Sequence, residues 1–70
     1  MRQFNTDRLR GRMVERGYNI KTLAEAIGVH PNTLSHKLYG NRYFTTREIA
    51  DICMVLAITE EQIPYYFFSL

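Results

Sequence analysis

The fold is decided by the stretch LAEAIGVHPNTLS, which occupies residues 23–35. Leu23, Ala24 and Ile27 recur at the spacing of one helix face. Gly28 comes next, and glycine readily takes the left-handed conformation that ends a helix. Pro31 then begins a second helix, because the first helical position needs no N–H group. A turn this short makes the two helices cross steeply, so we predict a helix-turn-helix.

Five helix starts share one pattern. An apolar residue precedes a capping residue, and a second apolar residue follows five positions after the first, which is the hydrophobic staple. The capping positions are Asn5, Asn19, His30, Thr45 and Thr59. His30 is a poor capping residue by type. Two capping boxes are expected, one from Thr45 with Glu48 and one from Thr59 with Gln62.

Glycines follow three of the helical runs, at positions 17, 28 and 40, and each is suited to end a helix. Starts and ends together predict one all-α domain over residues 1–70. Its predicted helices span residues 6–16, 20–27, 31–39, 46–57 and 60–66.

The predicted core consists of the apolar residues that helical spacing places on one face of each helix. They are Leu9, Met13 and Val14, then Leu23, Ala24 and Ile27, then Leu34 and Leu38, and finally Ile49, Ile52, Cys53 and Leu56. Cys53 is the single cysteine, and its place in this set predicts a small buried hydrophobe rather than a reactive thiol.

Charge is distributed unevenly along the chain. The net charge is +2, but residues 1–42 carry eight Lys or Arg against three acids, giving +5, and residues 43–70 carry one Arg against four acids, giving −3. This asymmetry indicates a basic surface for a polyanion, with an unevenly charged solvated surface as the alternative. We expect Arg10, Arg12 and Arg16 to form mostly a solvated face of the first helix.

Composition excludes several classes of protein. A hydrophobic share of 46% fits a packed globule rather than a disordered chain. There is no apolar run of the about 18 residues that a membrane span needs, and no signal-peptide segment at the N-terminus. The sequence has no paired-carboxylate site and no histidine and cysteine ligands at zinc spacing. Ser35 and His36 are adjacent, but neighbouring positions on a helix point about 100° apart, so they cannot act as a nucleophile and its base. We expect no enzymatic activity, no metal, no cofactor and no membrane association, in a cytoplasmic protein.

Residues 23–35 resemble the helix-turn-helix core of the Cro and phage-repressor family. The segment LYGNR at residues 38–42 resembles the loop after the family's recognition helix, and the last two predicted helices resemble the family's last two. The likeness covers residues 5–64, and both chain ends are similar to those of small phage-encoded regulators of low-GC Gram-positive hosts. It implies a compact five-helix fold of the lambda-repressor type, with helix 31–39 in the major groove of duplex DNA.

The resemblance also implies roles for single residues. Asn32 would contact adenine and His36 guanine. Thr33 and Ser35 would make short contacts to the methyl group of a thymine base or to a phosphate. The implied phosphate ligands are Asn19, Lys21, Thr22, Lys37, Asn41 and Arg42. For each of these residues, an exposed polar position without a DNA contact is the alternative.

The helix-turn-helix departs from the family pattern at several positions. Pro31 stands where family members often have a polar base-reading side chain, and helix 31–39 has no Arg or Gln. Many members join their first and third helices by an Arg–Glu pair. The matching residues here are Met13 and Leu38, which we expect to pack together without the desolvation cost of an ion pair.

The aromatic run IPYYFF at residues 63–68 allows two interpretations. In the first, Phe67 and a neighbour fold back onto the first and last helices and enlarge the core. In the second, Tyr65, Tyr66 and Phe68 form an interface for a second copy or a protein partner. Both hold if phenylalanine faces inward and the tyrosines face outward.

Two functions are compatible with these features. The leading hypothesis is a Cro-like transcriptional regulator that binds duplex DNA as a homodimer on a near-palindromic operator. The alternative is a modulator or antirepressor that binds a phage repressor protein through its helix-turn-helix surface or its aromatic tail. The low net charge and the absence of Arg and Gln from helix 31–39 motivate the alternative.

Overall fold

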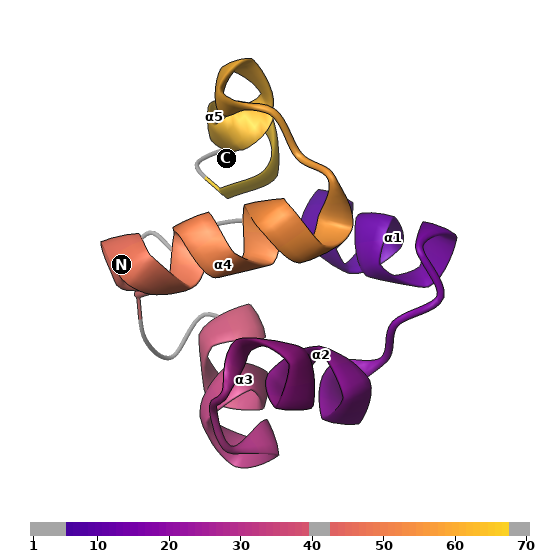
Figure 1. Ribbon diagram of the computed structural model, residues 1–70, viewed down its shortest axis with the longest axis vertical. Coiled ribbons are helices and arrows are strands. Elements are labelled where there is room, and N and C mark those ends of the chain that lie inside the picture. The colour runs from indigo at the N-terminus through magenta and orange to yellow at the C-terminus, as the bar shows by residue number, and fades with distance from the viewer. Residues whose placement is uncertain (1–5, 40–42, 68–70) are drawn as a thin grey trace.

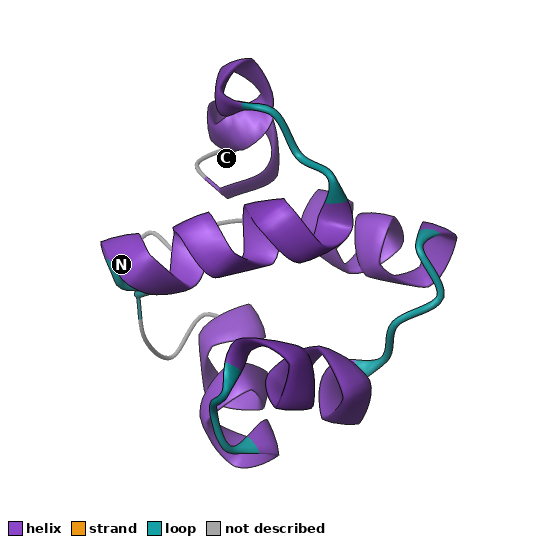
Figure 2. Cartoon of the chain, viewed as in Figure 1, coloured by secondary structure: helices purple, strands orange, loops and turns teal. Residues whose placement is uncertain are grey.

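The computed structural model describes residues 6–39 and 43–67, and in this part every regular element is helical (Figures 1 and 2). The elements are α1 (Asp7–Glu15), α2 (Ile20–Ile27), α3 (Pro31–Leu38), α4 (Thr46–Leu56), the 3-10 helix η1 (Glu60–Gln62) and α5 (Ile63–Phe67). In Figure 1, α4 crosses the middle of the molecule, with α2 and α3 below it and α5 above it. The five predicted helices are confirmed, except that the last is divided into η1 and α5.

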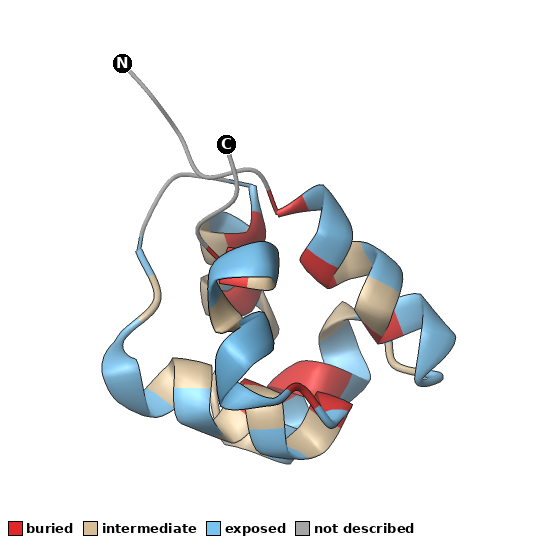
Figure 3. Ribbon diagram, turned by 90° about the horizontal axis from the view of Figure 1, so that it is seen from above, coloured by how far each residue is buried: buried red, intermediate tan, exposed pale blue. Residues whose placement is uncertain are grey.

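A single cluster of buried side chains forms the core. Figure 3 colours the buried residues red along the ribbon. Its members come from all five α-helices and from the segment after α4. They are Leu9, Met13, Leu23, Ala24, Leu34, Leu38, Ile52, Leu56, Ile58 and Phe67. Three further predicted core residues, Ile27, Ile49 and Cys53, are half-buried against this cluster. Ala24 is fully buried, which fits a small side chain between closely packed helices.

The prediction of a core position for Val14 is wrong, because this side chain is 76% exposed. Leu9 and Met13 are four residues apart, so both point toward the core from one side of α1. Val14 is rotated by about 100° from Met13, which turns it away from that side. It lies instead on the face of α1 that carries Arg10, four residues earlier.

Three helices end with the same backbone geometry. At the end of each of these helices, one residue has a left-handed backbone conformation. Its φ is 81° at Gly17 after α1, 76° at Gly28 after α2 and 57° at Ala57 after α4. The next residue then donates its N–H to a carbonyl five positions back. These bonds join Tyr18 to Met13 (2.8 Å), Val29 to Ala24 (3.0 Å) and Ile58 to Cys53 (2.9 Å). Such an ending reverses the chain and returns an apolar side chain to the core.

The predicted helix endings at Gly17 and Gly28 are confirmed. The ending at Ala57 was not predicted, because alanine seldom takes a left-handed conformation. The predicted ending at Gly40 lies outside the described residues. At the first helix start, Asn5 also lies outside them, and the residue before α1 is Thr6, whose side chain makes no capping bond.

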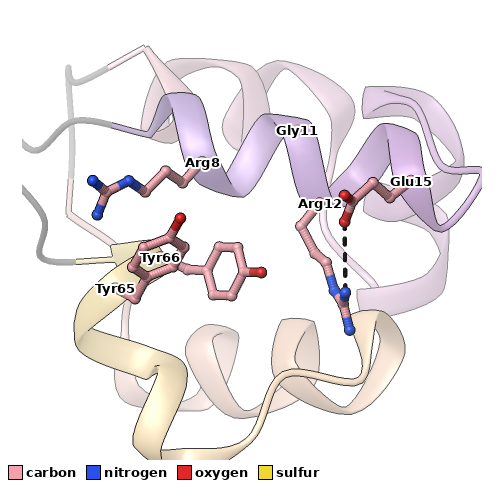
Figure 4. A pocket seen from close by; sticks show the side chains of 6 residues that line it. All are labelled: Arg8, Gly11, Arg12, Glu15, Tyr65 and Tyr66. Atoms are coloured by element: carbon pink, nitrogen blue, oxygen red, sulfur yellow. Dashed lines mark ion pairs between the residues drawn. The ribbon is translucent and has the colours of Figure 1, made fainter.

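Arg12 closes the carboxyl end of α4. Its Nε donates to the Leu56 carbonyl and its Nη2 to the Ala57 carbonyl, each over 2.9 Å. The Arg12 guanidinium also lies 3.5 Å from the Glu15 carboxylate, which Figure 4 shows as a dashed line. A cation at the negative end of a helix dipole is stabilising. The prediction that Arg12 belongs to a solvated face is therefore wrong.

None of the helices within residues 6–39 and 43–67 combines the length and the apolarity needed to cross a membrane.

The left-handed conformation of Ala57 predicts a stabilising substitution. Ala57→Gly removes the contact between Cβ and the backbone and should raise the free energy of unfolding by about 0.5–1 kcal/mol. Urea unfolding measures this change. Ala50→Gly is the matched control, because Ala50 is exposed within α4 and its replacement should lower stability by about 1 kcal/mol. Equal losses in both variants would contradict the prediction.

Candidate nucleic-acid interface

The amino end of α2 is organised by a reciprocal cap. The Asn19 side chain accepts from the Thr22 N–H over 2.8 Å, and the Thr22 hydroxyl accepts from the Asn19 N–H over 2.9 Å. Lys21 lies between them and is exposed. Both polar side chains of the cap are thus engaged in holding the helix start. Other first-turn N–H groups and the Lys21 ammonium remain as the donors for a phosphate.

The amino end of α3 is capped by an imidazole. His30 has an extended backbone, and its Nδ1 accepts from the Asn32 N–H over 3.1 Å. Pro31 follows as the first helical residue, as predicted. The residue type had indicated a poor cap at His30. The structure corrects this, because an unprotonated imidazole nitrogen is an acceptor like the oxygen of Asn or Ser.

The exposed face of α3 carries the predicted base contacts. Asn32 and His36 are both exposed and lie four positions apart, so they share one side of the helix. Thr33 and Ser35 are half-buried on either side of that face. The structure therefore brings the predicted base-contacting residues together on one helix surface.

Two predicted phosphate ligands, Asn41 and Arg42, lie outside the described residues. A third, Lys37, has a different partner from the one predicted. Its Nζ lies 2.5 Å and 2.6 Å from the two carboxylate oxygens of Glu48, and the side chains are only 10% and 15% exposed. Lys37 thus joins α3 to the start of α4, and we no longer count it among the phosphate ligands.

Glu48 has two roles in this ion pair. Its Oε1 also accepts from the Thr45 N–H over 2.8 Å, and the Thr45 hydroxyl accepts from the Glu48 N–H over 3.1 Å, which completes the predicted capping box. Burial raises the pKa of the Glu48 carboxyl. The hydrogen bonds from Lys37 and Thr45 and the charge of Lys37 together lower this pKa by more than burial raises it, so it lies below its ordinary value. The carboxylate is therefore held in its charged form.

The carboxyl end of α3 is tied to α1. The buried Thr6 hydroxyl donates to the carbonyl of Leu38, the last residue of α3. Leu38 and Met13 are both buried in the core cluster, as expected for the apolar replacement of the family's Arg–Glu pair. The Thr6 contact was not predicted, since it joins residues 32 positions apart. Contacts at both ends therefore fix how α3 presents its exposed face.

The aromatic tail folds inward at Phe67. This ring is 3% exposed and packs edge-to-face on Phe44, with ring centroids 5.5 Å apart. The inward interpretation is confirmed for Phe67, although the ring that it meets belongs to the segment before α4. Of the predicted interface residues, Phe68 lies outside the described part of the chain.

The two tyrosines lie against α1. The Arg8 guanidinium stands 4.1 Å from the ring centroid of Tyr65, which is 51% exposed, and Tyr66 is half-buried. Figure 4 shows both rings beside the Arg8 and Gly11 portion of α1, where they line a small hollow of about 160 Å³. Their contacts within the chain leave only part of their surface for a partner.

Over residues 6–39 and 43–67, no three His, Cys, Asp or Glu side chains come together as a metal site. Cys53 is half-buried, and burial raises the pKa of its thiol, which disfavours the nucleophilic thiolate.

The fold and this surface define the chain as a helix-turn-helix DNA-binding domain of the compact lambda-repressor-like type. More specifically, the chain belongs to the Cro/C1-type HTH DNA-binding domain family, because residues 8–68 match that family's sequence model. Comparison with curated proteins found no match.

Among solved structures, the chain is similar to the modulator of repression (MOR) of the temperate bacteriophage TP901-1 from Lactococcus lactis. The TM-score is 0.80 and the sequence identity 29%, over 94% of this chain and 89% of the phage protein.

The ion pair of Glu48 predicts a loss of stability in acid. Because the folded-state pKa lies below the ordinary value of 4.5, the pair stabilises the fold fully above that pH and less as pH falls through the folded pKa. Glu48→Gln keeps an acceptor for Thr45 but loses the charge. We expect it to cost about 1–3 kcal/mol at neutral pH, a difference that shrinks as pH falls through the folded pKa of Glu48.

Urea unfolding at several pH values measures this dependence. The matched control is Glu25→Gln, which changes an exposed carboxylate on α2 and should follow the wild-type protein at each pH. A cost for Glu48→Gln that does not depend on pH would contradict the role of the ion pair.

The cap at His30 predicts a second stability change. His30→Ala removes the acceptor for the Asn32 N–H and should cost about 0.5–2 kcal/mol, whereas His30→Ser supplies a good cap and should cost little or nothing. Thermal unfolding of the two variants tests this. If serine and alanine were equally destabilising, the imidazole would not act as the cap.

Proposed function

We propose that this chain is a sequence-specific transcriptional regulator of Cro-like type, which places α3 in the major groove of duplex DNA. The single observation that carries the proposal is the exposed face of Asn32 and His36 on the second helix of a helix-turn-helix. In a bidentate contact, Asn32 would accept from N6 and donate to N7 of adenine. His36 would donate to N7 or O6 of guanine. The short side chains of Thr33 and Ser35 would contact the DNA from the two borders of this helix face.

The phosphate contacts proposed for this complex come from the start of α2. Its dipole and first-turn N–H groups favour an anion, and the exposed Lys21 adds a charge. Asn19 and Thr22 would act by holding this helix end in shape. Phosphate contacts of this kind set the register of the domain on the duplex and carry no sequence information.

We further propose that two copies bind a near-palindromic operator, since two-fold related domains match such a site. The exposed parts of Tyr65 and Tyr66 are the candidate contacts between copies that stand side by side on the operator. We also keep the prediction that this chain works by binding and not as an enzyme.

Band shifts on a duplex selected from a random library test the DNA-binding role. Asn32→Ala and His36→Ala should each weaken selective binding by about 1–3 kcal/mol, with little change on unrelated DNA. Lys21→Ala should weaken binding to all sequences and lower the salt slope by about one unit. Glu61→Gln, an exposed change on η1, is the control. Selective binding that both α3 variants retain would contradict the proposal.

A second candidate is modulation of repression by contact with a phage repressor protein. The likeness to the phage TP901-1 modulator of repression favours it, as it extends over nearly the whole chain. The ion pairing of Lys37 adds support, because it removes one cation from the surface available to DNA. A repressor encoded beside this chain's gene is the natural partner to test.

The complex mass after mixing the two proteins separates the candidates. A stable complex that excludes operator DNA supports modulation. If the two proteins remain separate after mixing and this chain alone binds DNA selectively, the result supports the Cro-like role.

A further inference from the structure

A shallow groove of about 470 Å³ runs along α1 and the start of α2. Its apolar lining includes Val14 of α1, Tyr18 and Ile20 around the turn, and Tyr39 after α3. Val14 is 76% and Tyr39 55% exposed, so the fold leaves this apolar surface open to water. Exposed apolar side chains that line one groove are suited to contact a partner.

Two cations border the groove. Lys21 is exposed, and Arg10 is held in place by an ion pair with Asp7 and by the ring of Tyr39, whose centroid lies 5.1 Å from its guanidinium carbon. The groove therefore offers an apolar floor with positive charge at its border. The chemistry that fits it is an apolar side chain next to a carboxylate.

The same chain presents that chemistry on α4. Met54 is 81% exposed, and the exposed Ala50, four positions earlier, lies on its side of the helix. The exposed Ala57 follows directly after the end of α4. Asp51, three positions before Met54, adds a carboxylate that is 38% exposed and 3.9 Å from the highly exposed Arg47. We call these residues, Ala50, Asp51, Met54 and Ala57, the Met54 ridge.

We propose that the groove of one copy binds the Met54 ridge of a second copy, head to tail. The flexible methionine side chain suits an irregular apolar groove. The acidic second part of the sequence, at −3, would face the basic first part, at +5. Because groove and ridge are different surfaces, the contact is heterologous and leaves one free groove and one free ridge in each pair.

Head-to-tail contact would compete with DNA. Asn19 and Lys21 line the groove and also stand at the proposed phosphate site of α2. A copy seated in the groove would cover that site, so association would hold the protein in a form with less DNA affinity. This consequence rests on the proposed function, whereas self-association itself is measured without DNA, so each can fail separately.

Sedimentation velocity of the unaltered protein tests the contact first. Interfaces below the standard size bind weakly. The average mass should therefore rise as the protein concentration increases from about 10 µM to about 1 mM. Added salt should reduce this rise, because it screens the charges on both surfaces. Protein that stays monomeric throughout this range would overturn the proposal and leave the groove to another partner.

Two single variants then test which surfaces meet. Val14→Asp places a carboxylate in the groove, and Met54→Lys places a cation on the ridge. Both positions are highly exposed, so both variants should fold normally. Each variant alone should remain monomeric, whereas Ala26→Asp, an exposed change outside both surfaces, should associate like the wild type.

Mixing the two variants gives the decisive measurement. The Val14→Asp protein keeps an intact ridge and the Met54→Lys protein keeps an intact groove. An equimolar mixture should therefore form mixed pairs, because this intact ridge and this intact groove can meet. A mixture in which both proteins stay monomeric, or a Met54→Lys variant that associates alone, would overturn the head-to-tail assignment.

Discussion

The exposed face of α3 depends on one hydrogen bond, which the Val29 N–H donates to the Ala24 carbonyl. This bond forms because Gly28, between them, has a left-handed conformation. It ends α2 abruptly and turns the chain so that Val29 packs against the core. The next helix then starts within two residues and packs against α2. A residue with a costly left-handed conformation at position 28 would oppose this turn, and with it the placement of α3.

The turn alone does not fix how α3 presents its polar face. Three further contacts do so, one at the helix start and two near its end. His30 caps the first turn, Lys37 is ion-paired to Glu48 at the start of α4, and the Thr6 hydroxyl binds the Leu38 carbonyl. Because Glu48 also caps α4, the same carboxylate sets the start of one helix and the position of another. The exposed side chains of α3 therefore stand on a helix held at both ends, which favours precise recognition of a partner.

The composition of that face is compatible with two functions, DNA binding and contact with a repressor protein. Asn32 and His36 expose hydrogen-bonding groups of the kind that base edges need, but the exposed positive charge beside them is modest, and Lys37 is ion-paired to Glu48 within the fold. The apolar groove with Val14 and Tyr39 lies beside the positively charged start of α2. A protein contact and a DNA contact would thus share one part of the surface, and occupation of the groove would alter access to DNA. Competition between the two proposed contacts would follow from this shared position.

What the sequence by itself determined is local: the helices, the caps at Asn19 and Thr45, the glycine endings of α1 and α2, and the grouping of Asn32 with His36. These features arise from residues within about five positions of one another, where spacing alone dictates geometry. Only the tertiary structure decided the partners of Arg12, Thr6 and Lys37, which lie 44, 32 and 11 positions away. It also decided that Val14 faces water, because a small domain buries just one side of α1 and an apolar residue on another side has nothing to pack against.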